Sequence, residues 1–178
     1  MRKQIQARTI LCAAAVVLGV ALFVPQPYAE TSVRDAAALG KSSLIYVATV
    51  RKDGNQSKAA PVWFITTRDN QVLIETSPTS WKAKRIKRGS PAIVWIGRSD
   101  GPAFIGKAEI VSDKALQDLV IDEYPRKYLL ARVGFARPTR EKIDNGRICV
   151  IRITPVRDLP EGFKSEPGTP APKIDAAP

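Results

Sequence analysis

The chain of 178 residues is long enough for one domain with a proper core plus terminal tails, and it contains no histidine. The missing imidazole excludes Ser-His-Asp and Cys-His nucleophile pairs and histidine-ligated zinc or haem. Carboxylates, lysine, tyrosine or a bound cofactor must therefore carry any chemistry. Lys and Arg outnumber Asp and Glu by 28 to 17, a net charge of +11 that favours anionic partners.

Residues 1–29 have the three-part pattern of a secretory signal peptide. Three basic residues precede an apolar run from Ile10 to Val24, and a short segment ending at Ala29 follows. The run is short for a membrane span, which needs about 20 residues. We therefore expect export with cleavage after Ala29, with an uncleaved N-terminal anchor as the alternative. Cleavage removes three basic and no acidic residues, which leaves a net charge of +8 and Cys149 as the last cysteine.

Six strands are predicted in chain order, linked mostly by short turns. They cover residues 43–51, 57–66, 71–76, 92–96, 104–111 and 148–154. Asp53-Gly54 is a tight-turn signature between the first two strands. Pro61 lacks an N–H, so it indicates a sheet edge, a bulge or a strand start. The pattern favours a mainly-β fold, a small six-stranded antiparallel barrel, and the alternative is an open α+β sheet.

Three helices are predicted before and between these strands. A short helix over residues 32–41 is expected to pack on the barrel end, and another follows Ser80. A third begins at the cap Ser112-Asp113 and ends at Pro125, before a less regular segment and the strand that Pro155 stops. We expect one barrel domain over residues 30–158. From Leu159 onward the chain has five prolines and little to bury, which predicts a disordered tail whose deletion changes stability little.

The stretch from Val72 to Gly89 has the outline of an anion-binding turn. A β-rich run ends at Pro78, and Ser80 lies where the following helix needs an N-cap. Free backbone N–H groups and the positive end of the helix dipole are expected to point out of such a turn. The side chains that can reach the same place are those of Thr76, Thr79, Ser80, Lys82 and Lys84. An ordinary capped surface helix with a solvated basic face explains the same residues equally well.

The order of these parts resembles the flavin- and deazaflavin-binding split β-barrels, the pyridoxamine 5'-phosphate oxidase-like superfamily. The resemblance runs from about Ala36 to Arg157 and depends on five segments in the same order. They are Ala48-Thr-Val with the Asp53-Gly54 turn, Pro61-Val-Trp-Phe64, Thr76 with Ser80-x-Lys82-x-x-Arg85-Ile86, Gly106-Lys-Ala-Glu-Ile-Val111 and Ile151-Arg-Ile-Thr-Pro155. The resemblance implies an antiparallel split barrel of the FMN-binding type.

In that family the turn after the third strand holds the cofactor phosphate, and the strand with Pro-Val-Trp lies against the ring system. The residues that the resemblance places at the phosphate are Ser80 and Lys82, with Thr76 and Thr79 assisting. Those that it places at the isoalloxazine ring of FMN are Pro61, Val62 and Trp63. Hydride transfer would belong to the ring and not to a protein base, so no catalytic residue is assigned. The resemblance also implies a homodimer, with the cofactor in a groove between two subunits.

Two departures separate this chain from true pyridoxamine 5'-phosphate oxidases. Those enzymes have Ser-Arg-Lys in the turn, where this chain has Trp81 in the middle. They also carry an Arg and a Lys on the preceding strand, where this chain has Ala60 and Ile65. The specific oxidase activity is therefore not expected. The deazaflavin branch commonly has Asn where Arg85 stands, so that branch is not matched cleanly either. FMN is the expected cofactor, and the alternative is a 5-deazaflavin coenzyme or no cofactor.

Three functions compete. The leading hypothesis is an exported FMN-binding protein that acts as a flavin-dependent oxidoreductase. The alternative is a non-catalytic envelope protein of the same fold that binds another anionic small molecule, a deazaflavin, or no cofactor. It gains weight because no twin-arginine pair precedes Ile10, which indicates the general secretion channel. That channel passes unfolded chains, which cannot carry a cofactor with them, so the cofactor would have to be found outside. Nucleic-acid binding by the basic residues around Trp81 is the third, but export removes the protein from most nucleic acid, so we do not expect it.

Overall fold

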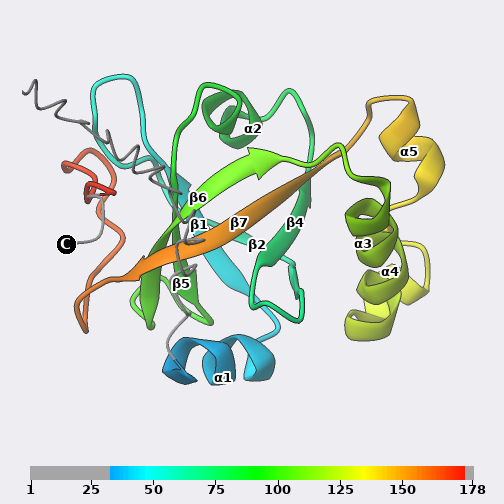
Figure 1. The fold of residues 1–178 in the computed structure, drawn as a ribbon, viewed down its shortest axis with the longest axis horizontal. Helices are drawn as coiled ribbons and strands as arrows, with labels where there is room; N and C mark the ends of the chain where they lie inside the picture. The colour runs from blue at the N-terminus through cyan, green and yellow to red at the C-terminus, as the bar shows by residue number, and fades with distance from the viewer. Residues whose placement is uncertain (1–32, 175–178) are drawn as a thin grey trace, which may run out of the picture.

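The computed structural model describes residues 33–174 as one curled antiparallel sheet with helices around it (Figure 1). The strands are β1 Ile45–Thr49, β2 Ala60–Val62, β3 Ile65–Thr66, β4 Val72–Thr76, β5 Ala92–Ile96, β6 Ala103–Ile110 and β7 Cys149–Asp158. Their order across the sheet is β2-β1-β5-β6-β7-β4-β3. This confirms the predicted mainly-β split barrel, with seven strands in place of six.

The seventh strand arises because the expected strand over residues 57–66 is divided in two. β2 pairs with β1 at one edge of the sheet, and β3 pairs with β4 at the other edge. Pro61 lies in the edge strand β2, where a missing N–H is tolerated. Trp63 and Phe64 carry the chain from one edge to the other. This short connection therefore closes the curled sheet on itself.

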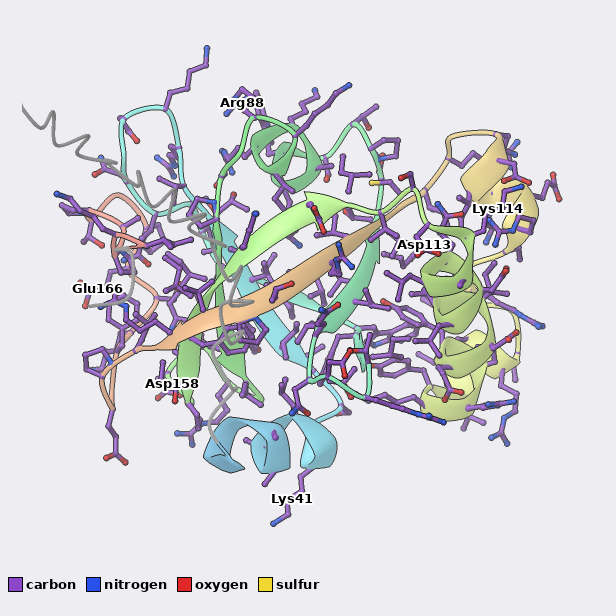
Figure 2. All side chains as sticks on the ribbon, in the orientation of Figure 1. Lys41, Arg88, Asp113, Lys114, Asp158 and Glu166 are labelled. Atoms are coloured by element: carbon purple, nitrogen blue, oxygen red, sulfur yellow. The ribbon has the colours of Figure 1, made fainter. Side chains whose placement is uncertain are left out.

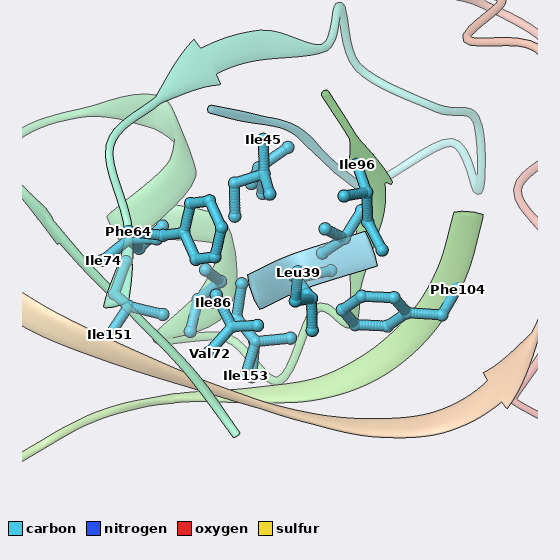
Figure 3. Close-up of a cluster of buried hydrophobic side chains, with 14 of the residues drawn as sticks. Leu39, Ile45, Phe64, Val72, Ile74, Ile86, Ile96, Phe104, Ile151 and Ile153 are labelled. Carbon is cyan, nitrogen blue, oxygen red and sulfur yellow. The ribbon is translucent and has the colours of Figure 1, made fainter. Parts of the chain in front are cut away.

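Both faces of the sheet are covered, so several strands are apolar throughout instead of alternating. In β4, Val72 and Ile74 belong to the interior cluster, whereas Leu73 lies in a second cluster under the helices. Figure 3 shows Phe64, Ile74 and Phe104 pointing into the interior cluster. All five residues of β5 are buried, because the C-terminal segment covers the outer face of this strand.

Five helices are described over residues 33–174. They are α1 Val33–Lys41, α2 Trp81–Ile86, α3 Lys114–Lys127, α4 Leu129–Arg132 and α5 Arg140–Asp144. α1 lies at one end of the barrel and buries Leu39 in the interior cluster, as predicted (Figure 1). The prediction that α3 ends at Pro125 is wrong, because the helix continues to Lys127. Pro125 has no N–H to donate to the carbonyl one turn earlier, and the last turn is instead held to the barrel by the hydroxyls of Tyr124 and Tyr128, which bond to the backbone of residues 63 and 64.

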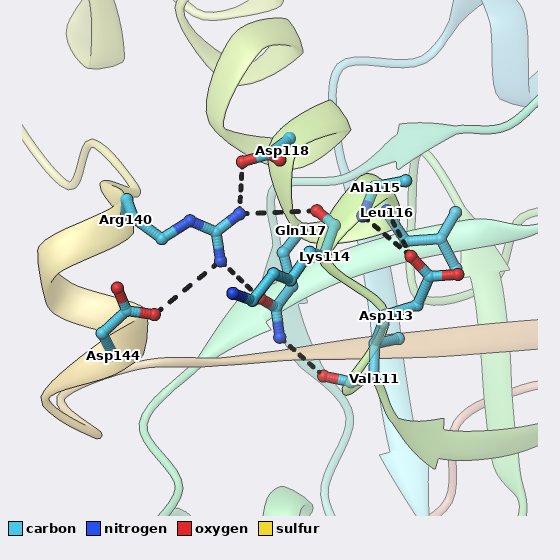
Figure 4. A network of polar contacts seen from close by, with 9 residues as sticks. All are labelled: Val111, Asp113, Lys114, Ala115, Leu116, Gln117, Asp118, Arg140 and Asp144. Carbon is cyan, nitrogen blue, oxygen red and sulfur yellow. Dashed lines mark hydrogen bonds and ion pairs between the residues drawn. The ribbon is translucent and has the colours of Figure 1, made fainter.

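One arginine ties α5 to α3. Arg140 donates to the Gln117 amide oxygen at 2.6 Å and forms ion pairs with Asp118 and Asp144 (Figure 4). The Gln117 amide nitrogen in turn donates to the Val111 carbonyl at 3.0 Å, where the chain leaves β6. The network therefore fixes the helical region 114–144 to the end of the sheet.

β7 does not stop at Pro155 as predicted but runs on to Asp158. The strand passes the proline through an irregularity in its pairing with β6. Gly106 lies opposite Pro155, and Ile105 lies opposite Arg157, so one residue of β7 is extra. Such a bulge is a position where a missing N–H is tolerated. Gly106 is needed there, because an added Cβ would lie 2.7 Å from the Ile153 Cγ2.

The prediction of a disordered tail after Asp158 is wrong for residues 159–174. Leu159 is 4% exposed, and the Phe163 ring stacks on Trp95 with centroids 5.9 Å apart. The Trp95 indole nitrogen donates to the Phe163 carbonyl at 2.8 Å. Farther along, the Gln56 N–H donates to the Thr169 carbonyl at 2.8 Å. The tail docks because it supplies the apolar cover that the outer face of β5 and β6 otherwise lacks.

The predicted signal segment, residues 1–29, lies outside the described residues, so both of its interpretations stay predictions. Within residues 33–174, no helix combines the length and the apolar character that crossing a bilayer requires.

Candidate functional site

The turn between β4 and α2 forms around the Ser80 hydroxyl. Its oxygen accepts the Ala83 N–H at 3.1 Å, which confirms the predicted N-cap. The Thr76 hydroxyl, at the end of β4, donates to the same oxygen at 3.2 Å. The Ser80 hydroxyl hydrogen therefore points away from both donors and can bond to a third group. Thr79 lies beside them, with its hydroxyl 2.8 Å from that of Ser77.

The backbone N–H groups of this turn are less available than the sequence predicts. The Thr79 N–H donates to the Ser77 hydroxyl and the Ser80 N–H to the Ser77 carbonyl, both within the turn. The N–H groups of Trp81 and Lys82 remain without a partner among residues 33–174. α2 has only six residues, so its dipole is small and contributes little to an anion site. Side chains must supply most of the attraction.

Lys82 is the charge that best fits an anion. Its ammonium is partly buried, and burial lowers its pKa from 10.5 to about 8. Among residues 33–174, no carboxylate pairs with it. A desolvated cation without a counter-charge, in the first turn of a helix that a hydroxyl caps and that has two unpaired N–H groups, suits a phosphate. The residues present therefore fit the phosphate group of the cofactor that the family resemblance implies.

The other basic residues of α2 have different surroundings. Lys84 is exposed, with its ammonium 5.2 Å from the Trp81 ring centroid. Arg85 lies over the same ring at 5.6 Å and donates to the Thr49 hydroxyl at 3.3 Å. Arg88 extends outward from the end of the helix (Figure 2). The basic helix is therefore not a uniform patch, because Lys82 differs from Lys84 by burial and from Arg85 by having no described side-chain hydrogen bond.

The predicted ring-binding residues lie at the division between β2 and β3. Pro61 is exposed on β2, and Val62 packs partly against the interior cluster. Trp63 is half-buried, and its ring stacks on Tyr128 with centroids 4.6 Å apart and planes 8° apart. One face of the Trp63 ring is thus occupied by the protein itself. Pro61, Val62 and the remaining surface of Trp63 could border a ligand.

A tyrosine hydroxyl connects the two parts of the predicted site. The Tyr124 hydroxyl donates to the Trp63 carbonyl at 3.0 Å and accepts the Glu75 N–H at 3.0 Å. Glu75 precedes Thr76, the first hydroxyl of the turn. Trp63 and the end of β4 therefore lie on either side of one hydroxyl, so the structure brings the segment 61–63 next to the turn.

Sequence reasoning missed the residues that organise this region. Tyr128 both donates to the Phe64 carbonyl at 2.7 Å and accepts the Phe64 N–H at 2.8 Å. The Lys127 ammonium lies 3.4 Å from the Phe64 ring centroid, and burial lowers its pKa to about 8. The spacing of Tyr124 and Tyr128, four residues apart, places them on one helical face, but the assumption that Pro125 ends the helix concealed it.

Three hollows are described in residues 33–174. The largest, about 500 Å³, lies between α1, β3 and α3, and its charged lining residues are Arg68, Glu123 and Lys127. A smaller one of about 220 Å³ has Arg51, Lys52, Arg85 and Arg88 in its lining. A third of about 260 Å³ lies where the C-terminal segment begins. The seven predicted site residues do not line any of these three hollows.

The comparisons with known proteins agree with this architecture. The model of the pyridoxamine 5'-phosphate oxidase family matches residues 34–159. Among curated proteins, none matches the chain. Among solved structures, the FAD and heme binding protein from Mycobacterium smegmatis is similar at 20% identity and a TM-score of 0.54, over 77% of this chain and 75% of that chain.

Two further solved structures show the same fold. A conserved hypothetical protein from Mycobacterium tuberculosis is 21% identical, with a TM-score of 0.53 over 72% of this chain and 82% of that chain. A candidate pyridoxamine 5'-phosphate oxidase from Listeria innocua is 16% identical, with a TM-score of 0.53 over 71% of this chain and 94% of that chain. At these identities the likeness shows the fold alone. The family model, however, covers well over half of the chain. The chain therefore belongs to the pyridoxamine 5'-phosphate oxidase family, whose flavin-binding split-barrel fold it shares.

Proposed function

We propose that the protein is an exported FMN-binding member of its family that acts as a flavin-dependent oxidoreductase. The observation that carries the proposal is Lys82, a desolvated ammonium without a carboxylate partner in the described residues, two residues after Ser80, whose hydroxyl oxygen accepts a hydrogen bond from the Thr76 hydroxyl. The likeness to a structure named as an FAD and heme binding protein supports a flavin as the ligand. When bound, FMN would supply the hydride or electron transfer, which belongs to the ring and not to a protein base.

The chain's own residues would bind and orient this cofactor. Lys82 supplies the charge for the phosphate, and the Ser80 hydroxyl hydrogen, which is not used within the turn, donates to it. Thr76 and Thr79 assist by holding the neighbouring hydroxyls in place. Pro61, Val62 and Trp63 border the ring. Of these, Pro61 presents no N–H and is exposed on an edge strand, so a ring can lie over it without leaving a donor unpaired.

Proton binding at Lys82 should accompany cofactor binding. In the free protein its pKa is about 8. A phosphate dianion, whose own second pKa is about 6, restores the preference for the charged ammonium. Above pH 8 the free protein must therefore take up a proton when it binds the phosphate. We expect the affinity for FMN to fall as the pH rises from 8 to 9, whereas a Lys82→Ala variant should lack this dependence.

The decisive experiment compares Lys82→Ala with Lys84→Ala by FMN titration. Loss of a charge-assisted hydrogen bond costs roughly 1.5–3 kcal/mol, so Lys82→Ala should weaken binding about ten- to a hundred-fold. Lys84 is exposed and engaged with Trp81, so its removal should cost much less. Equal and modest losses of FMN affinity in both variants would mean that α2 attracts the cofactor only through its overall positive charge. Purified protein without a flavin spectrum or measurable FMN affinity would reject the proposal.

The second candidate is a non-catalytic envelope protein that binds another anionic small molecule or a 5-deazaflavin coenzyme. Ile65 favours it, because this position is 4% exposed and packs in the cluster under α3. True oxidases of the family carry a phosphate-gripping Lys there, so this chain holds phosphate with fewer groups. The absorbance spectrum of protein purified from the native envelope separates the candidates, since oxidised flavin, deazaflavin and empty protein differ.

Two parts of the proposal concern assembly and location. We propose a homodimer, because the family resemblance places the cofactor in a groove between two subunits, which a second copy beside β2 and the turn would complete. Light scattering at micromolar concentration tests this, and a monomer would contradict it. Export depends on residues 1–29, and cell fractionation with N-terminal sequencing of the mature protein would distinguish a cleaved signal from an anchor.

A further inference from the structure

We propose that the turn built by α4 and the residues after it docks this protein on an anionic membrane surface. Seven large apolar side chains are exposed in the described residues, and four of them fall within residues 129–135. These four are Leu129, Leu130, Val133 and Phe135, with exposed fractions of 69, 52, 72 and 66%. We call them the apolar cap. Single exposed apolar residues are common on soluble proteins, but a contiguous group of four indicates an interaction surface.

Backbone hydrogen bonds hold the apolar cap together as a compact tip. The Phe135 N–H donates to the Leu130 carbonyl at 2.9 Å and the Gly134 N–H to the Ala131 carbonyl at 3.1 Å. Gly134 has a φ of 94°, the left-handed conformation of a Schellman helix end. This motif brings Phe135 back beside Leu130. Ala131 is fully buried beneath them, so the cap faces outward from an anchored base.

The cap is rigidly placed at one end of the molecule. α4 packs beside α3, and the Arg140 network ties α5 to the same helix (Figure 4). In Figure 1, α3, α4 and α5 lie at the opposite end of the long axis from the C-terminal segment. The cap can therefore meet a flat surface without obstruction from that segment.

The charge around the cap has one sign. Residues 126–140 contain five basic and no acidic residues. Arg126 pairs with Glu123, and Arg140 pairs with Asp118 and Asp144, whereas Arg132 and Arg137 have no ion pair among residues 33–174. Apolar side chains interleaved with uncompensated arginines are typical of segments that lie in the headgroup region of anionic bilayers.

Shape, area and charge favour a bilayer over another protein. A stable protein interface uses about 20–30 residues on each side, far more than a cap of four side chains. A second copy meeting the same face would bring two copies of one positively charged patch together, so like charges would oppose the contact. A small convex apolar tip can instead enter the headgroup layer. This inference does not depend on FMN binding or on the fate of residues 1–29.

The experiment uses the full chain and vesicles of phosphatidylcholine with or without phosphatidylglycerol. Hydrogen exchange of the peptide that covers residues 129–135 is the local readout. We expect slower exchange there with anionic vesicles and no change with phosphatidylcholine alone. The readout stays valid if residues 1–29 insert by themselves, because it reports on the cap and not on the whole chain.

Matched variants give the second readout, vesicle co-sedimentation. Val133→Ser with Phe135→Ser should lower partitioning about tenfold or more, because both side chains are exposed and removable without loss of core packing. Arg132→Gln with Arg137→Gln should lower it roughly fivefold per residue on anionic vesicles only. The controls are Ile110→Ser, an exposed apolar side chain elsewhere, and Lys52→Gln with Lys107→Gln, two basic residues elsewhere.

The outcomes separate the possibilities. Local protection that disappears in both cap variants and persists in both controls supports the proposal. Unchanged exchange of residues 129–135 on anionic vesicles overturns it, even when the whole chain sediments with them. A dimer in light scattering that Val133→Ser with Phe135→Ser converts to a monomer would also overturn it, because the cap would then be a contact between copies.

Discussion

Tyr128→Phe should weaken the connection that closes the sheet. The hydroxyl is the only described partner of both the Phe64 N–H and the Phe64 carbonyl, and Phe64 has no exposed surface. Its removal leaves a buried donor and a buried acceptor unpaired, at about 1–3 kcal/mol each. We therefore expect the free energy of unfolding to fall by about 2–6 kcal/mol, which lowers the melting temperature by roughly 10 °C in a domain of this size.

The variant separates hydrogen bonding from packing. Phe keeps the ring that stacks on Trp63, so the fall in the free energy of unfolding reports on the hydroxyl alone. Burial raises the pKa of Tyr128 to about 12, so both bonds persist at ordinary pH. Thermal and urea unfolding would be compared with Tyr46→Phe, a half-buried tyrosine of β1 without a described hydroxyl bond. Equal melting temperatures for the two variants would refute the reasoning, because the Phe64 backbone would then find other partners.

Three further outcomes follow from packing and charge. Leu159→Ala should lower the free energy of unfolding by about 2–5 kcal/mol, and deletion of residues 159–178 should lower the melting temperature further; an unchanged melting temperature would show that the docked segment contributes nothing. Gly106→Ala should lower the urea midpoint, because its Cβ would lie 2.7 Å from Ile153 Cγ2 and 2.8 Å from the Thr154 carbonyl oxygen. Lys82 binds its proton more tightly in the unfolded chain, so the free energy of unfolding should rise by up to about 3 kcal/mol between pH 8 and 10.5, relative to that of Lys82→Met. Free energies of unfolding that change in parallel with pH in the two proteins would show that this ammonium is solvated.

The anion turn was predictable because its determinants are local. Ser80 caps a helix whose first residue follows it directly, and Thr76 reaches the same hydroxyl from four residues away. Strand positions were equally readable from apolar runs. The local pattern could not show that Thr79, Ser80 and Ala83 already use their N–H groups within the turn, since this depends on the backbone path.

The errors all concern partners that are distant in the sequence. Pro155 interrupts a strand only when no bulge receives it, and that bulge depends on Gly106, about fifty residues earlier. The tail is proline-rich, which predicts disorder, but Trp95 and the outer face of β5 give Leu159 and Phe163 a surface to bury. The composition of a segment does not show which apolar surface elsewhere in the fold is left for it to cover.

The division between β2 and β3 has the same origin, and it bears on function. A continuous strand over residues 57–66 would satisfy the Trp63 and Phe64 backbone with ladder bonds, and none of these bonds would depend on α3. Here Tyr124 and Tyr128 replace the ladder, and Tyr124 also receives the Glu75 N–H. The spacing between the proposed ring-binding segment and the proposed phosphate turn is therefore set by one helix hydroxyl. Burial raises the Tyr124 pKa far above its ordinary value, so this hydroxyl keeps its proton and can keep donating to Trp63. A side chain from α3, and not the sheet alone, thus positions the two halves of the candidate site.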